Sequence, residues 1–328
     1  MDSVLNEPVI FEPYFKSVIW GGDKIAEFKN VTTELHDIGE SWEISAVPGF
    51  ESIVAEGQLK GMNISDLINR YGVDFLGTKV IGKFHNDFPL LVKIIDARAD
   101  LSVQVHPDDA LAAYRHNSPG KSEMWYIIDR LSGAKIYSGL RAELSPESYC
   151  THIANNSIME VVGVHESEPG QFYYVPAGTL HAIGAGNLLA EIQQTSDITY
   201  RVYDYGRRDA EGNTRELHTE LAKDAIDYRY PNDIFPTATT FGVTTEGVVT
   251  SPYFKTDFLN LHEGEQFEVF TEGCSFAIIM VTEGVLTITR NTDGRQFVYS
   301  RGSTVLLPAA MPACTLSGST KALLVTMP

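Results

Sequence analysis

Short runs of β-branched and aromatic residues, separated by Gly, Pro, Asn and Asp, recur along most of this 328-residue chain. We predict strands at residues 90–95, 124–128, 171–175, 276–281, 287–289 and 304–307. Closely spaced short strands are typical of a sandwich or a barrel. Helices are few, and their caps, acidic first turns and prolines place them at residues 66–71, 107–116, from 146 onward, and 218–227. We expect Ser65 and Ser145 to cap two of them.

Residues 170–187 predict a strand, a tight turn and a second strand. Pro176 and Gly178 favour a turn that most residues resist, and His181 follows directly after it. The same spacing of glycine and proline recurs at Gly302 and Pro308, where Ala313 replaces His181. Two related barrels, the second without this histidine, would explain the repeat, and chance similarity is the alternative.

The length of the chain exceeds the usual range of a single core, so two domains or one large composite domain are expected. Pro-rich sequence at residues 231–240 predicts a linker. We therefore divide the chain into residues 1–235, which contain the candidate site, and residues 236–328, which form a second barrel without metal ligands.

The net charge of −18 argues against nucleic-acid and anionic-membrane partners, because both require a basic surface. No apolar stretch is long enough to span a bilayer, and the N-terminal residues do not resemble a signal peptide. The three cysteines (Cys150, Cys274 and Cys314) are scattered, which favours reduced thiols in a cytoplasmic protein. A small phosphorylated ligand stays compatible with the acidic surface, because a few converging cations hold it locally.

Five polar residues suggest a metal site. Gln104 and His106 share one face of a predicted strand, and so do Lys121 and Glu123, because alternate residues face the same side. With His181, the set offers two imidazoles, a carboxylate and an amide oxygen. Such donors suit a borderline divalent ion, with zinc as the default and manganese, iron, cobalt or nickel as alternatives. The other seven histidines have no such context and are interpreted as structural.

The sequence resembles a known family at several separate places. Residues 170–187 resemble the second motif of the cupins, and Gln104, His106 and the distant Glu123 resemble one cupin family, the type I mannose-6-phosphate isomerases. Further similarity to that family covers residues 14–22, 39–45, 101–109 and 121–125. Ser122 stands where the family usually has proline. The similarity is strong over the first two thirds of the chain.

This resemblance implies a mainly β fold of two cupin-type jelly-roll barrels with a few short helices. It also implies an isomerase that interconverts mannose 6-phosphate and fructose 6-phosphate through an enediol, with one Zn²⁺ per chain. The implied metal ligands are Gln104, His106, Glu123 and His181. The implied catalytic residues are Arg201, Glu191, Lys121 and Asp197, and the implied substrate contacts are Ser102, Lys93 and Lys121.

Several residues have a second interpretation. Lys93 lies on an apolar strand, so it either extends to the surface or points into a polar cavity, and the resemblance favours the cavity. Arg201 would otherwise form a salt bridge with Asp204, and Asp197 would otherwise be a turn residue. The tryptophans are predicted to be core or pocket wall (Trp20, Trp42 and Trp125).

Two other functions fit parts of the pattern. One is a metal cupin with different chemistry, such as a dioxygenase or another sugar-phosphate isomerase, and the other is a non-catalytic sugar-binding cupin. Gln104 and the cationic set of Lys93, Lys121 and Arg201 favour a hexose phosphate ligand. A non-catalytic protein would be expected to have lost metal ligands. The sequence leaves open whether the protein is a monomer or a homodimer.

Overall fold

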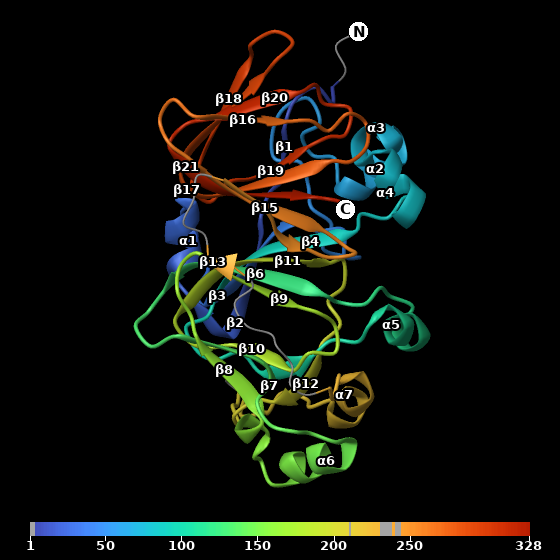
Figure 1. Ribbon diagram of the computed structural model, residues 1–328, viewed down its shortest axis with the longest axis vertical. Coiled ribbons are helices and arrows are strands. Elements are labelled where there is room, and N and C mark those ends of the chain that lie inside the picture. Colours follow the sequence, from blue (N-terminus) through green and yellow to red (C-terminus); the bar gives the residue numbers. More distant parts are fainter. Residues whose placement is uncertain (1–3, 210, 230–237, 240–243) are drawn as a thin grey trace.

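The computed structural model describes residues 4–209, 211–229, 238–239 and 244–328, and it has the mainly β architecture predicted from the sequence. Its strands form three antiparallel sheets, arranged in layers along the long axis of the molecule (Figure 1). A seven-stranded sheet lies in the middle. The nine-stranded sheet above it contains the C-terminal strands, and a five-stranded sheet lies below.

The seven-stranded sheet has the order β13 (Ala238–Thr239), β9 (Gln171–Val175), β6 (Glu123–Arg130), β11 (Asn187–Gln194), β4 (Leu90–Asp96), β3 (Ile38–Ile44) and β2 (Tyr14–Gly22). The five-stranded sheet has the order β12 (Tyr200–Tyr203), β5 (Val103–Val105), β10 (His181–Ile183), β7 (Lys135–Leu140) and β8 (Val162–Glu166). The nine-stranded sheet contains β1 (Val9–Ile10), β14 (Thr244–Thr250), β15 (Lys255–Leu261), β16 (Gln266–Val269), β17 (Ala277–Arg290), β18 (Gln296–Ser300), β19 (Thr304–Leu307), β20 (Cys314–Ser317) and β21 (Thr320–Thr326).

The helices are short and lie around the outside of the three sheets (Figure 1). They are α1 (Lys24–Lys29), α2 (Ile64–Tyr71), α3 (Val73–Leu76), α4 (Thr78–Phe84), α5 (Asp109–His116), α6 (Pro146–Ala154), the 3₁₀ helix η1 (Ile158–Glu160) and α7 (Thr219–Ala225). Over the described ranges, no helix combines the length and apolar character needed to cross a bilayer.

Two predictions about these elements were wrong. The cap of α2 is Asn63, whose side chain accepts from the Asp66 amide at 2.7 Å, so the helix begins before Ser65. Residues 287–289 do not form a separate strand. They belong to β17, which pairs with β19 and β21 in its first half and with β18 and β20 in its second. Ser145 caps α6, as predicted.

Successive side chains along each strand of the middle sheet point to opposite faces, and the two faces have different roles. On β4, Val92 and Ile94 face the nine-stranded sheet and join a core that includes Phe258 and Ile278. Lys93 faces the opposite side, toward the five-stranded sheet. Because alternate residues of a strand point to opposite faces, one short strand contributes both to the core and to a polar cavity.

Smaller cores fix the outer layers. The outer face of the five-stranded sheet packs Val103, Val105 and Ala182 against residues of α6 and α7, such as Tyr149 and Ala222. The C-terminal strands form their own core (including Leu259, Ile279, Ile288, Leu316 and Leu324).

The turn predicted at residues 170–187 connects two sheets, since β9 belongs to the middle sheet and β10 to the five-stranded one. Gly178 has φ of 91°, and its amide donates to the His106 carbonyl at 2.9 Å. In the repeat, β19 and β20 stay in one sheet and pair with different halves of β17, β19 with Ala277–Met280 and β20 with Thr287–Arg290. Gly302 has φ of 85° and Gly170 has φ of 89°.

The division at residue 235 stays a prediction, as does the linker, most of which lies outside the described residues. Contacts between the two parts of the chain begin near the N-terminal end: β1 pairs with β19, with Val9 opposite Leu306. The Gly302 carbonyl also accepts from Lys29 Nζ at 2.7 Å.

Replacing Gly302 should test the packing of α1 against the C-terminal strands. A Cβ at Gly302 would lie 2.7 Å from both Lys29 Cα and the Phe28 carbonyl oxygen, whereas a Cβ at Gly294 would meet no atom within 4 Å. Both glycines have positive φ, so Gly294→Ala should lower the free energy of unfolding by about 1–2 kcal/mol through backbone strain alone. Gly302→Ala should lower the free energy of unfolding clearly more than Gly294→Ala, as measured by urea denaturation. Equal losses would show that the contact between α1 and this turn adjusts freely.

Candidate functional site

A cavity of 370 Å³ lies between the middle and five-stranded sheets. Both sheets contribute polar side chains to its wall, and Lys93, Glu191, Gln104 and Arg201 are among them. A wider cleft of 760 Å³ borders Asp197 from the other side, but it contains none of the predicted metal ligands. We therefore place the candidate site in the smaller, polar cavity.

Strand register aligns the polar residues of the five-stranded sheet. Gln104 on β5 is opposite His181 on β10 and opposite Arg201 on β12. Side chains directly opposite each other in a sheet point to the same face. The three residues therefore form one row across neighbouring strands.

A second row crosses the middle sheet. Glu191 on β11 is opposite Trp125 on β6 and Lys93 on β4, and Lys93 is opposite Trp42 on β3. This row faces the cavity, so a buried carboxylate and a buried ammonium lie side by side between two indole rings.

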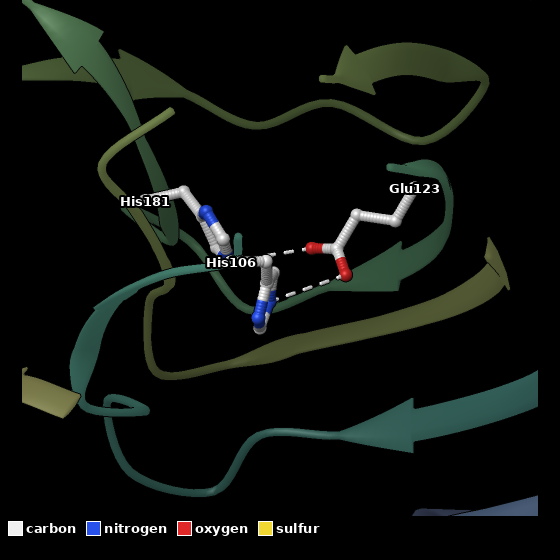
Figure 2. Close-up of side chains that lie close together, drawn as sticks. All are labelled: His106, Glu123 and His181. Carbon is white, nitrogen blue, oxygen red and sulfur yellow. Dashed lines mark ion pairs between the residues drawn. The ribbon is translucent and has the colours of Figure 1, made fainter. Parts of the chain in front are cut away.

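His106, Glu123 and His181 point toward one another (Figure 2). One ligand atom from each lies within 4.8 Å of the others. Glu123 Oε2 is 3.5 Å from His106 Nε2, and Glu123 Oε1 is 3.3 Å from His181 Nε2. All three side chains are buried. The structure therefore brings these three predicted residues together, and their role as metal ligands stays a prediction.

Hydrogen bonds to backbone fix the orientation of both imidazoles. His106 Nδ1 donates to the Ile198 carbonyl at 2.8 Å, and His181 Nδ1 donates to the Thr179 carbonyl at 2.9 Å. The Nε2 lone pairs are then directed toward Glu123. Burial lowers the pKa of His181 to about 4 and lowers the pKa of His106 well below its usual value. Neutral imidazoles with a free Nε2 are the form that binds metal ions.

Glu123 is a buried acid with an unused acceptor. Burial raises its pKa to about 7, against the opposing effect of the Lys121 ammonium. Lys121 Nζ donates to Glu123 Oε2 at 2.6 Å and to His106 Nε2 at 2.9 Å. Glu123 Oε1 has no hydrogen-bond donor among the described residues. A divalent cation therefore fits this donor set.

Gln104 completes the group. Its side-chain amide lies 3.2 Å from His181 Nε2. A half-turn of the amide places its oxygen at the same position, because the two ends of the amide have nearly the same shape. The fourth predicted ligand is therefore adjacent to the other three.

Lys93 points into the cavity, which settles the choice left open by the sequence. Its ammonium is 3.0 Å from Glu191 Oε1 and 4.0 Å from Glu40. Trp125 Nε1 donates to Glu191 Oε2 at 2.9 Å. Burial alone would raise the pKa of Glu191, but the charge of Lys93 outweighs it and lowers this pKa to about 2. Glu191 is thus held as a carboxylate.

Arg201 does not form the alternative salt bridge with Asp204. That carboxylate pairs with Arg207 and Arg215 instead. Arg201 Nη1 donates to the Glu216 carbonyl at 2.9 Å, and its buried Nε has no partner in the part of the chain that the structure describes. Burial lowers the pKa of Arg201. The guanidinium therefore keeps unused donors at the cavity.

The remaining predicted residues differ in exposure. Ser102 is buried and lines the cavity, while Asp197 is exposed and lies between the cavity and the wider cleft. All three tryptophans are buried. The sequence interpretation missed Lys16, Glu40 and Arg215, which also line the cavity. Glu40 is two residues from Trp42 on β3, so strand alternation would have placed both on one face.

A mainly β fold with a buried cluster of imidazole and carboxylate donors beside a cavity defines a cupin-type protein with a candidate metal site. The family model described as phosphomannose isomerase type I, catalytic domain, matches residues 10–125. The chain is 43% identical to mannose-6-phosphate isomerase ManA of Bacillus subtilis (strain 168), over 68% of this chain and 69% of that protein. It is 32% identical to the mannose-6-phosphate isomerase of Streptococcus mutans, over 96% of each chain.

Solved structures of phosphomannose isomerases have the same fold as this chain. The crystal structure of a mannose 6-phosphate isomerase from Bacillus subtilis has a TM-score of 0.83 at 33% identity, covering 97% of this chain and 99% of that one. A mutant phosphomannose isomerase from Salmonella typhimurium shares the fold alone, with a TM-score of 0.78 at 14% identity, over 97% and 98% of the two chains. The chain belongs to the type I phosphomannose isomerase family.

Breaking the ion pair between Lys93 and Glu191 should be costly. Lys93→Met leaves a buried carboxylate without its cation, so the free energy of unfolding at neutral pH should fall by about 3–5 kcal/mol in urea denaturation. Lys93→Met combined with Glu191→Gln should recover part of this loss. Lys24→Met, which removes an exposed pair with Asp129, should cost no more than about 1 kcal/mol. Similar losses for Lys93→Met and Lys24→Met would contradict the assignment.

The same pair predicts a pH dependence. The pKa of Glu191 in the folded protein, about 2, lies below its ordinary value of 4.5. The ion pair should therefore stabilise the folded protein fully at pH values above 4.5, and this stabilisation should disappear as the pH falls toward 2. The difference in stability between wild type and Glu191→Gln should shrink over this interval.

Proposed function

We propose that this protein is a metal-dependent aldose–ketose isomerase that interconverts mannose 6-phosphate and fructose 6-phosphate through an enediol. The observation that supports this most directly is a buried His/Glu/His cluster beside the cavity that Lys93, Glu191 and Arg201 line, with Gln104 and Lys121 contacting both. Membership of the phosphomannose isomerase family supports the choice of substrate.

We propose that Gln104, His106, Glu123 and His181 hold one Zn²⁺ per chain. The set contains nitrogen and oxygen donors, which zinc accepts, and lacks the thiolates typical of closed structural sites. When bound, the ion would act as a Lewis acid toward the sugar oxygens that gain charge during isomerisation.

Arg201 is proposed to stabilise the negative charge of the enediolate. Its Nε is buried and has no partner within the described ranges, so a substrate oxygen would satisfy it. A guanidinium stays charged over the working pH range, and donors already in place at a developing charge lower the barrier.

Proton transfer between C1 and C2 requires a group whose pKa is near the working pH. Lys93 and Trp125 hold Glu191 ionised, with a pKa of about 2, which makes it a weak base. This favours Lys121 or Asp197 for the transfer and gives Glu191 a role in orienting Lys93. We propose Ser102, Lys93 and Lys121 as contacts of the substrate, since all three line the cavity.

We also propose a cytoplasmic location, supported by cysteines that are free in the described ranges. The prediction leaves both a monomer and a homodimer open.

Removing a ligand should remove the metal. Elemental analysis of purified protein should find about one divalent ion per chain. His181→Ala should lose it, whereas His262→Ala, which changes an exposed histidine outside the cavity, should keep it. A chelator should abolish conversion of mannose 6-phosphate in a coupled assay. A metal-loaded protein with no turnover of any hexose phosphate would refute the isomerase and leave another metal cupin function.

Arg201→Ala should separate rate from metal binding. Without the guanidinium, kcat should fall on the order of a hundredfold to a thousandfold, the usual effect of losing one stabilising donor. Metal content should not change. Arg301→Ala, at an exposed arginine away from the cavity, serves as the matched control. Normal kcat in Arg201→Ala would exclude the proposed role.

A further inference from the structure

The cations of the cavity differ in how completely they are neutralised. Lys93 pairs with Glu191, and Lys121 pairs with Glu123. Lys16 lies 4.0 Å from the centre of the Trp42 ring. The carboxylates of Glu40 and Asp197 lie close enough to Lys16 to affect its pKa, which burial lowers overall. An incoming anion at any of these lysines would face a nearby carboxylate.

Three arginines near Asp204, of which Arg201 and Arg215 line the cavity, leave positive charge in excess. Asp204, a buried carboxylate, accepts hydrogen bonds from both Arg207 and Arg215. Arg201 adds a third guanidinium and has no carboxylate at ion-pair distance within the described residues. The Glu216 side chain is 84% exposed, so water screens its charge. Three guanidiniums thus lie near a single buried carboxylate, although the net charge of the whole protein is −18.

Arg215 is held in place and still has a donor to spare. Its Nε donates to Asp204 Oδ2 at 2.8 Å, and its Nη2 donates to Asp204 Oδ1. Nη1 has no hydrogen-bond partner among the residues that the structure describes, and the residue lines the cavity. Fixing one edge of a guanidinium by a carboxylate reduces the entropy lost when the other edge binds a ligand.

The position of these arginines suits the far end of a substrate. His181, Gln104 and Arg201 follow one another on adjacent strands, about 4.8 Å apart. Arg201 is therefore on the side of Gln104 away from His181, and Arg215 lines the same cavity. A hexose whose C1 and C2 oxygens lie between the His/Glu/His cluster and Arg201 can extend its C6 end toward Arg215.

We propose that Arg215, oriented by Asp204, binds the phosphate group of the substrate through its free Nη1. This inference rests on the proposed isomerase function. Guanidinium is the preferred partner of phosphate because its planar donors match the phosphate oxygens. Arg207 has the same carboxylate partner but does not line the cavity, and its Nη1 donates to the Asp100 carbonyl at 2.5 Å.

The test compares Arg215→Gln with Arg207→Gln in the metal-loaded enzyme. Each variant removes one of the two arginines bound to Asp204, so the structural cost should be similar, and urea denaturation checks this. Arg215→Gln should raise KM for mannose 6-phosphate on the order of tenfold to a hundredfold, the usual effect of losing a hydrogen bond from a charged group. Its kcat should change much less. Arg207→Gln should leave KM within about threefold, and Arg215→Lys should restore part of the affinity.

Inorganic phosphate provides a readout that needs no turnover. Calorimetry on the metal-loaded protein should show weaker binding of phosphate to Arg215→Gln by the same factor, and unchanged binding to Arg207→Gln. If the wild type binds phosphate in this way but converts no hexose phosphate, the proposed function fails and the anion site stands. Equal phosphate binding by wild type and Arg215→Gln would overturn the site. The site would also be overturned if Lys16→Met lost phosphate binding while Arg215→Gln retained it.

Discussion

The alternation of side chains along the middle sheet is the constraint on which the rest of the structure depends. Strands β4, β6 and β11 are buried on both faces. One face packs against the C-terminal strands through apolar residues such as Val92 and Ile94. The other holds Lys93 and Glu191, which are tolerable there because each neutralises the other. Any shift of register by one residue would exchange these faces and bury the charges in the apolar core.

The candidate site contains more buried charge than a protein core usually accepts, and its members are arranged in pairs. Lys93 with Glu191 and Lys121 with Glu123 leave little net charge near the His/Glu/His cluster. The excess positive charge is kept around Asp204. The cavity thus has a nearly neutral end with metal-type donors and a cationic end. Such a division suits a ligand with a neutral polar end and an anionic end.

Much of the site could be predicted from the sequence because period-two spacing places Gln104 with His106 and Lys121 with Glu123. The turn at Gly178 indicated where His181 begins its strand. The sequence could not show that Asp204 pairs with Arg207 and Arg215 instead of Arg201, since loop geometry decides among neighbouring arginines. The cap of α2 was misplaced for a similar reason: Asn63 and Ser65 are both good capping residues, and tertiary contacts select one.

The pairing of β1 with β19 has a consequence for how the chain folds. Val9 and Leu306 are neighbours in the sheet although nearly the whole chain separates them. A strand pair of such long range loses much loop entropy before it gains any contact, so it forms late in folding. Until then, the outer edge of β19 is unpaired, and an unpaired edge can add a strand from another molecule. Strand β1 therefore acts as an intramolecular cover of the β19 edge, which limits aggregation once it has paired.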